Sequence, residues 1–203
     1  MQFINVKYLV SAPSSSSWPN EDLPEFVFIG KSNVGKSTLI NSLCNNSNIC
    51  RVSSMPGRTR LLNFFDVNKE LRLVDAPGYG FAYLDKNNDA LFAKMMREYL
   101  FKRKNLKGCC LLLDSRLKPS EDDAVMFNMI IDANLPFIII ATKCDKFGKS
   151  QIKPQMQKIA NFLGVGKDNV FASSGDNGYG RLEILKKFDQ FLEVEEEIES
   201  SEE

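Results

Sequence analysis

The sequence predicts a single α/β domain built on a mostly parallel, six-stranded sheet with helices on both faces. Short apolar runs typical of strands alternate along the chain with longer stretches of helical periodicity. This alternation is typical of parallel strands joined by crossover helices. Only Asn68–Glu70 separates the second run from the third, which is too short for a crossover, so these two strands should form an antiparallel hairpin. The predicted sheet therefore contains one antiparallel strand.

Each element of this fold has a recognisable run. The predicted strands are Phe26–Ile29, Leu61–Val67, Leu71–Val74, Gly108–Leu113, Phe137–Ala141 and Val170–Ala172. The predicted helices are Ser37–Cys44, Asp89–Lys104, Pro119–Ala133, Gln151–Leu163 and Arg181–Glu193. The strands at 108–113 and 137–141 are apolar almost throughout, which indicates burial on both faces. Ser120, followed by the acids Glu121–Asp123, is typical of a helix start.

The ends of the chain differ in composition from the domain between them. Residues 1–23 are predicted to be a lead-in, because 11–23 are rich in serine, proline and acids and favour an extended or loose segment. Residues 24–193 are predicted to form the domain. The acidic residues 194–203 are predicted to be a disordered tail, with a frayed helix end as the alternative. Seven of the last eleven residues are glutamates, so the rest of the chain carries a surplus of seven bases. Such a surplus favours RNA binding no more than a solvated surface.

Composition also excludes several classes of protein. The chain lacks any apolar run of about 18 residues, so no membrane span is expected. It shows no basic segment followed by an apolar core at its start, which argues against secretion. The five cysteines have no C-x-x-C spacing and the chain has no histidine, so zinc sites are disfavoured and reduced packing thiols are expected. We expect a monomeric cytoplasmic protein without a membrane or DNA partner.

The most informative motif is GKSNVGKS at residues 30–37, between a predicted strand and a predicted helix. It matches G-x-x-x-x-G-K-[ST], whose glycines let backbone N–H groups close around phosphates at a helix N-terminus. Lys36 is placed to reach the β- and γ-phosphates, and the Ser37 hydroxyl is placed to ligate Mg²⁺. The motif predicts a nucleoside triphosphate site.

The tetrapeptide TKCD at residues 142–145 selects the base, because it directly follows a buried parallel strand and so lies at the ligand edge of the sheet. The Asp145 carboxylate can accept hydrogen bonds from N1–H and the 2-amino group of guanine, which adenine does not offer. The Lys143 stem can pack along the purine. Ser173 and Ser174 follow the last strand, where their N–H groups either meet the guanine O6 or form an ordinary turn.

Two further segments are candidates for the γ-phosphate. Asp75 ends a predicted strand within DAPG, where a carboxylate can hold Mg²⁺ through water and the N–H of Gly78 can approach the γ-phosphate. Thr59, in the loop PGRTR, can offer its hydroxyl to the metal and its N–H to the γ-phosphate. Loops anchored in this way lose their contacts on hydrolysis and act as switches.

The order GKSNVGKS, PGRT, DAPGYG, TKCD and SS resembles the EngB family (also called YsxC or YihA), within the Era/TrmE-like group of GTPases. The resemblance extends from about residue 24 to about residue 190. It implies a Ras-like P-loop GTPase fold, binding of GTP, GDP and Mg²⁺, and a role in assembly of the large (50S) ribosomal subunit through its rRNA and proteins. A link to normal cell division and septation is implied as a downstream effect.

The resemblance also implies a set of site residues. Nucleotide contacts fall on Gly30, Lys31, Ser32, Asn33, Val34, Gly35, Lys36, Ser37, Gly57, Arg58, Thr59, Arg60, Leu61, Asp75, Ala76, Pro77, Gly78, Thr142, Lys143, Cys144, Asp145, Ala172, Ser173 and Ser174. The metal ligands fall on Ser37 and Thr59, beside the acid Asp75, and the catalytic contacts fall on Lys36, Thr59 and Gly78. Lys31, Thr38 and Arg60 depart mildly from the family's usual Arg, Ser and Gln.

Hydrolysis by the isolated protein is expected to be slow. Many GTPases orient the attacking water with a glutamine after the D-x-x-G glycine, but here that position holds Tyr79. Acceleration is then expected from a partner or an ion. Related GTPases carry an asparagine at the position of Asn33 as a K⁺ ligand, so K⁺ is a candidate cofactor. The alternative is a loop asparagine whose side chain is satisfied by nearby backbone.

Three functions remain open from the sequence. A regulatory GTPase is favoured, a GTP-gated docking factor with incidental hydrolysis is the alternative, and an ATP-dependent kinase is disfavoured by TKCD. The cluster Lys102, Arg103, Lys104 and Lys107 is the candidate contact with ribosomal RNA, although such clusters are more often solvated faces.

Overall fold

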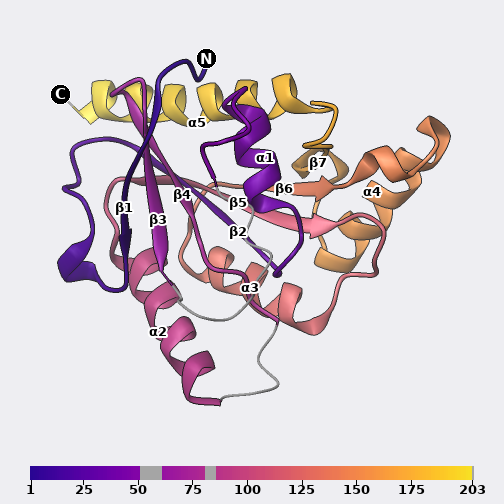
Figure 1. Ribbon diagram of the computed structural model, residues 1–203, viewed down its shortest axis with the longest axis horizontal. Helices are drawn as coiled ribbons and strands as arrows, with labels where there is room; N and C mark the ends of the chain where they lie inside the picture. Colours follow the sequence, from indigo (N-terminus) through magenta and orange to yellow (C-terminus); the bar gives the residue numbers. More distant parts are fainter. Residues whose placement is uncertain (51–60, 81–85, 203) are drawn as a thin grey trace.

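A computed structural model describes residues 1–50, 61–80 and 86–202, with backbone alone described at 86–89 and 194–202 (Figure 1). Its centre is a seven-stranded sheet in the order β1-β3-β4-β2-β5-β6-β7. The strands are β1 (Val6–Ala12), β2 (Glu25–Gly30), β3 (Leu62–Val67), β4 (Leu71–Asp75), β5 (Leu106–Asp114), β6 (Phe137–Thr142) and β7 (Val170–Ala172). All are parallel to one another except β3, which runs antiparallel to both of its neighbours, β1 and β4. The single antiparallel strand is therefore confirmed.

Helices cover both faces of the sheet, as predicted (Figure 1). They are α1 (Lys36–Leu43), α2 (Lys86–Lys102), α3 (Glu121–Asp132), α4 (Lys149–Leu163) and α5 (Arg181–Glu202), with short 3-10 turns at Ser15–Ser17, Cys144–Lys146 and Lys167–Asn169. The apolar side chains of α1 and α5 pack on one face, and those of α2, α3 and α4 pack on the other. None of the described helices is long and apolar enough to cross a membrane.

The sheet has one strand more than predicted. Strand β1 lies within residues 1–23, which were expected to form a lead-in, and pairs with β3 at the edge of the sheet. An edge strand is held mainly by backbone hydrogen bonds, and most β1 side chains stay exposed or half-buried. Its one short apolar run, Tyr8–Val10, is exposed or half-buried and was not recognised as a strand.

The C-terminal helix is longer than predicted. The sequence predicts a helix ending at Glu193, followed at 194–203 by either a disordered tail or a frayed helix end; α5 is helical to Glu202. Glutamate is a good helix former, and extending an existing helix avoids the cost of nucleating a new one. The tail nevertheless retains its concentrated negative charge.

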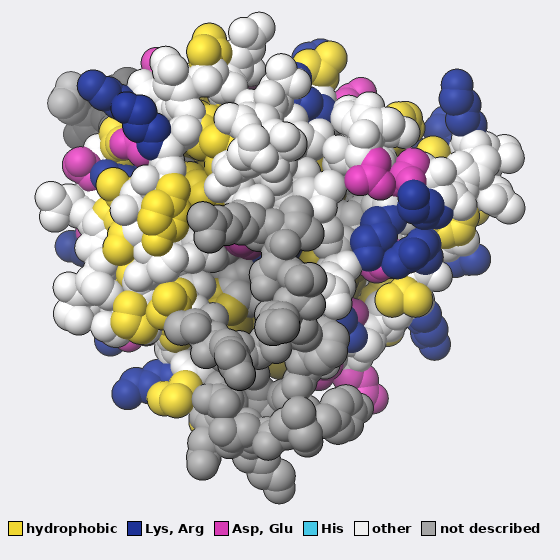
Figure 2. Space-filling view, in the orientation of Figure 1, with side chains coloured by type: hydrophobic (Ala, Val, Ile, Leu, Met, Phe, Trp, Pro, Cys, Tyr) yellow, Lys and Arg dark blue, Asp and Glu magenta, His cyan; other side chains and the backbone are white. Residues whose placement is uncertain are grey.

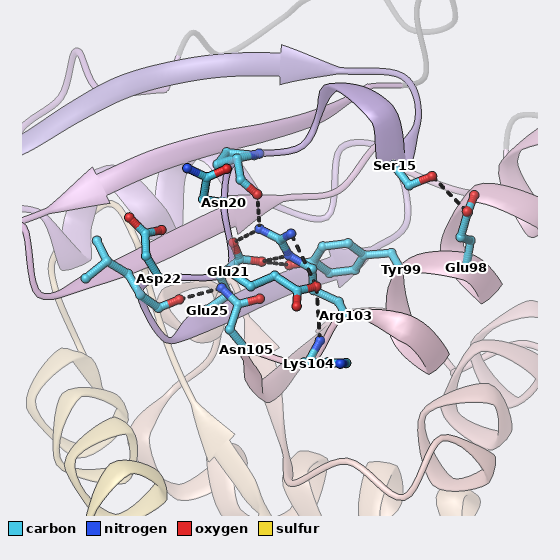
Figure 3. A network of polar contacts seen from close by, with 12 residues as sticks. Ser15, Asn20, Glu21, Asp22, Glu25, Glu98, Tyr99, Arg103, Lys104 and Asn105 are labelled. Atoms are coloured by element: carbon cyan, nitrogen blue, oxygen red, sulfur yellow. Dashed lines mark hydrogen bonds and ion pairs between the residues drawn. The ribbon is translucent and has the colours of Figure 1, made fainter.

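A buried ionic cluster fastens the segment before β2 to the end of α2 (Figure 3). Glu25 is fully buried and accepts hydrogen bonds from Arg103 Nη2 at 2.6 Å and Nε at 2.9 Å, and from the Tyr99 hydroxyl at 2.8 Å. Arg72 adds a contact of 3.8 Å to Glu25 and one of 2.6 Å to Asp22. Two guanidinium groups thus neutralise one buried carboxylate, which is the pairing that buried charges require.

The position of Arg103 in this cluster corrects the predicted contact with ribosomal RNA. Arg103 was grouped with three lysines as a candidate RNA contact, but its side chain is only 4% exposed and is directed at Glu25. Lys102 and Lys104 are exposed, while Lys107 is half-buried. Linear spacing did not distinguish a buried arginine from its exposed neighbours.

Candidate nucleotide site

The P-loop connects the central strand β2 to helix α1 at the carboxyl edge of the sheet. The neighbours of β2 are β4 on one side and β5 on the other, and such a branch point is where open α/β sheets bind ligands. Gly35 adopts φ 106°, a left-handed conformation that glycine accepts readily, and caps α1. The free N–H groups of this helix N-terminus lie where a phosphate is bound most favourably.

Asp75 is positioned as the acid of a metal site. It ends β4 and is buried, and its Oδ1 has no hydrogen-bond partner among the described residues. Burial raises the pKa of the Asp75 carboxyl, while the Lys36 ammonium and a hydrogen bond from the Ser37 hydroxyl oppose that rise. A buried, unpaired carboxylate oxygen beside a hydroxyl offers the hard oxygen ligands that Mg²⁺ prefers, so these residues fit a hydrated Mg²⁺.

The DAPGY segment lies directly against the P-loop. Tyr79 N–H donates to the Gly30 carbonyl at 3.4 Å, and Ser32 N–H donates to the Tyr79 carbonyl at 3.1 Å. A Cβ added to Gly78 would come within 2.7 Å of the Ser32 N and Cα atoms. Only glycine therefore fits at position 78, where this segment approaches the P-loop.

The Tyr79 side chain points into the protein. It is 7% exposed, and its hydroxyl donates to Asp123 Oδ1 of α3 at 2.8 Å. The sequence identified Tyr79 as the residue in place of a glutamine, but did not identify its partner, because Asp123 lies 44 positions away. In this arrangement, the phenol is occupied by a structural hydrogen bond.

A pocket of about 270 Å³ lies beside the TKCD motif. It is lined by Gly35, Thr38, Leu39, Arg116, Thr142, Lys143, Asp145, Lys146, Ser173, Gly175 and Asp176. The sequence-predicted base residues Asp145 and Ser173 are thus brought together with the start of α1. Asp145 forms an ion pair with Lys146 at a distance of 2.7 Å. The hydrogen bond from Lys146 lowers the pKa of the Asp145 carboxyl. An ionised carboxylate at this position can accept hydrogen bonds from N1–H and the 2-amino group of guanine. Adenine lacks both donors, so the pocket suits guanine better than adenine.

Two residues of TKCD support the P-loop itself. The buried Thr142 hydroxyl donates to the Val34 carbonyl at 2.7 Å. Lys143 Nζ donates to the Asn33 carbonyl at 2.6 Å and to Asp114 Oδ2 at 2.9 Å. The motif therefore has a structural role that the sequence analysis did not predict.

Asp114 is a site residue that the sequence analysis missed. Burial raises the pKa of its carboxyl, but hydrogen bonds from Arg116 and Lys143 outweigh this and hold that pKa at about 2. The carboxylate thus stays ionised and fixes the Lys143 ammonium. Asp114 lies at the carboxyl end of β5, level with Thr142, and this position could have identified it as a site residue from the sequence.

The remaining predicted site residues are either outside the described residues or placed with differing degrees of burial. Gly57, Arg58, Thr59 and Arg60 lie outside the described residues, so the third proposed metal ligand is not placed. Cys144 is buried and burial raises the pKa of its thiol, consistent with the expected packing role. The five cysteines are all buried and free. Leu61, Pro77 and Ala172 are half-buried, and Ala76 and Ser174 are buried.

This combination of a parallel sheet, a P-loop, a buried acid at the end of β4 and a guanine-type pocket defines the class of P-loop GTPases. Residues 25–143 match the family described as "50S ribosome-binding GTPase".

Curated relatives agree with this class. A probable GTP-binding protein EngB of Mycoplasma capricolum is 54% identical over 145 residues, covering 71% of this chain and 74% of the relative. The protein of the same description from Desulfosudis oleivorans is 39% identical over 192 residues, covering 93% of this chain and 98% of the relative. The chain belongs to the EngB family of GTP-binding proteins and is a GTPase.

Solved structures support the fold. A crystal structure of a probable GTP-binding protein EngB superposes with a TM-score of 0.68 at 21% identity, covering 84% of this chain and 99% of that one. A variant of Aquifex aeolicus Era bound to GDP and AlF4⁻ superposes with a TM-score of 0.64 at 22% identity, covering 83% of this chain and 56% of that one. The Ras-like arrangement expected from the sequence is thus confirmed.

Proposed function

We propose that this GTPase is a Mg²⁺-dependent switch in the assembly of the large ribosomal subunit. The observation that carries the switch is the buried Asp75 carboxylate, with an unpaired oxygen beside Ser37 and close to the segment where Gly78 meets the P-loop. The subunit is suggested by the matched family's description as ribosome-binding. A role in cell division and septation would then follow from ribosome supply, and the protein would act in the cytoplasm as a monomer.

The proposed site divides the nucleotide among three groups of residues. Gly30–Ser37 hold the phosphates, with Lys36 reaching the β- and γ-phosphates. Ser37, Thr59 and Asp75 hold Mg²⁺, which when bound neutralises charge on the phosphates. The N–H of Gly78 contacts the γ-phosphate, while Asp145 and residues 172–174 hold guanine.

We propose that hydrolysis is slow without a partner. The position after Gly78 holds Tyr79, whose hydroxyl is engaged by Asp123, so this position offers no glutamine-like amide to the attacking water. Asn33 is exposed, with φ 62°, and its carbonyl accepts a hydrogen bond from Lys143. A K⁺ ion held at the Asn33 side chain is the proposed ionic activator.

The presence of Tyr79 in place of a glutamine also supports a second candidate. This candidate is a docking factor in which GTP occupancy matters and hydrolysis is incidental. The two candidates differ in whether they require hydrolysis. Both need GTP to be bound, but only the switch needs hydrolysis to release the protein from the subunit.

The experiment that tests the proposal is co-sedimentation with immature large subunits. Protein loaded with the non-hydrolysable analogue GppNHp should sediment with them, protein loaded with GDP should not, and small subunits should retain neither. Protein incubated with GTP should bind and then leave as GTP is consumed. Binding that ignores the nucleotide contradicts the proposal, and retention after complete hydrolysis selects the docking factor.

The proposed contact with RNA involves exposed lysines near the end of α2. On the face shown in Figure 2, Lys and Arg side chains form separate groups with Asp and Glu among them, rather than one continuous basic surface. Lys102 and Lys104 remain exposed at the end of α2 and are the proposed contact. Their replacement by alanine should reduce both the affinity for the subunit and its dependence on salt.

A further inference from the structure

A buried polar cluster connects the segment after Gly78 to helix α3. Its members are Tyr79, Asp123, Lys31 and Ser120, and we refer to it as the Tyr79–Asp123 cluster. One carboxylate oxygen of Asp123 accepts a hydrogen bond from the Tyr79 hydroxyl at 2.8 Å. The other accepts the Ser120 N–H at 2.7 Å and the Ser120 hydroxyl at 3.0 Å.

Lys31 adds a cation to this cluster from the P-loop. Its Nζ lies 2.5 Å from Ser120 Oγ and 3.6 Å from Asp123 Oδ2. Asp123 is 4% exposed and Tyr79 is 7% exposed, so their hydrogen bond is shielded from water. A shielded hydrogen bond to a charged acceptor is stronger than a typical surface contact. Burial, and then the Asp123 carboxylate, raise the pKa of the Tyr79 phenol, so the hydroxyl remains a donor.

The cluster acts on the neighbouring residue, Gly78. The Tyr79 backbone is already joined to Gly30 and Ser32 in a short parallel bridge with the P-loop. The side-chain bond to Asp123 fixes Tyr79 from the opposite end. Because Gly78 is one peptide away, its backbone is held in close contact with the P-loop by both ends of Tyr79.

We propose that Asp123 is a positioning residue for GTP, which holds Tyr79 and thereby keeps Gly78 at the γ-phosphate side of the P-loop. This inference rests on the proposed contact between Gly78 and the γ-phosphate. GDP has no γ-phosphate, so its affinity does not depend on where Gly78 lies. Loss of the cluster therefore weakens GTP binding and leaves GDP binding largely unchanged.

The chain supplies a matched control for this proposal. Tyr99 is fully buried, and its hydroxyl donates to the buried Glu25 carboxylate at 2.8 Å, the same chemistry and distance as Tyr79 and Asp123 (Figure 3). It lies in α2, within the cluster that fastens the segment before β2. A purely structural role for Tyr79 predicts that the two tyrosines behave alike.

The test compares Tyr79→Phe with Tyr99→Phe by titrating fluorescent GDP and fluorescent GppNHp in Mg²⁺. Each change removes one oxygen, and Asp123 keeps its contacts with Ser120 and Lys31, so the variant is expected to fold. Tyr79→Phe should lower the ratio of GppNHp to GDP affinity about three- to tenfold, as expected for one lost hydrogen bond. Tyr99→Phe should lower the melting temperature and leave that ratio unchanged.

A second variant approaches the cluster from its cation. Lys31→Met removes the charge that faces Asp123, and should shift the ratio in the same direction by a smaller factor. An unchanged ratio in Tyr79→Phe, or an equal shift in Tyr99→Phe, overturns the inference.

The proposed function is tested separately in the same titration by Ser37→Ala. If this change abolishes the Mg²⁺ dependence of GppNHp binding while Tyr79→Phe has no effect on the ratio, the metal site stands and the positioning role fails. If Ser37→Ala leaves the Mg²⁺ dependence intact, the proposed metal site itself fails.

Discussion

Asp75 and Asp123 show how differently two buried carboxylates are stabilised within one site. Asp123 has donors for both oxygens, whereas Asp75 keeps one oxygen without a partner among the described residues. A buried charge without a partner costs free energy, so it is retained where a ligand completes it. A motif identified Asp75 as a site residue, whereas Asp123 was recognised only as part of a helix start. The burial and the partners of both carboxylates came only from the fold.

Replacing Asp75 should therefore separate folding from binding. Asp75→Asn removes a buried charge, so in EDTA near pH 7 the free energy of unfolding should rise by about 1–3 kcal/mol. Burial raises the pKa of Asp75 in the folded state, so its ionisation destabilises the fold as pH rises above its unfolded pKa of about 4. The gain should thus shrink as the pH falls towards about 4.

Urea unfolding of both proteins across this pH range measures the effect. The exposed acid Asp132 supplies the control, since Asp132→Asn should leave stability nearly unchanged. In Mg²⁺, Asp75→Asn should weaken GTP binding despite its greater stability. A variant that is less stable in EDTA and binds GTP normally contradicts the metal assignment.

At the scale of elements, the runs of apolar residues located six strands and five helices, with most boundaries within a few residues. The hairpin of β3 and β4 followed from its short connection, and the register Val67–Leu71 agrees. Strand β1 was missed because an edge strand exposes its side chains. The partners Asp114 and Asp123 were missed because contacts across the sheet edge depend on tertiary structure.

The contact between β6 and the P-loop gives a prediction at this scale. Thr142→Val removes the hydroxyl that donates to the Val34 carbonyl, so the P-loop loses its support from β6. The affinity for GTP and for GDP should fall together, by about three- to tenfold, since both nucleotides use the loop. Isothermal titration with each nucleotide measures this.

Ser115→Ala is the matched control. The buried Ser115 hydroxyl donates to the Thr142 carbonyl at 2.6 Å without touching the P-loop. Its loss should cost similar stability and leave both affinities unchanged. If Ser115→Ala and Thr142→Val reduce binding equally, support of the loop by Thr142 is refuted.

At the scale of the whole molecule, the N-terminal segment wraps the edge of the sheet and connects both layers. The Met1 amino group contacts Asp189 of α5 at 2.7 Å, β1 pairs with β3, and the Glu25 cluster joins β2 to α2. The helix that follows residues 81–85 is thus anchored at its C-terminal end by Arg103.

The central proposal is that GTP hydrolysis is slow in the isolated protein and is accelerated by the ribosomal partner. The most direct measurement is a GTP hydrolysis time course with and without immature large subunits, in K⁺ and in Na⁺. We predict a slow basal rate, a higher rate in K⁺ than in Na⁺, and a further increase with the subunits. A fast basal rate that neither K⁺ nor the subunits increase would contradict the account.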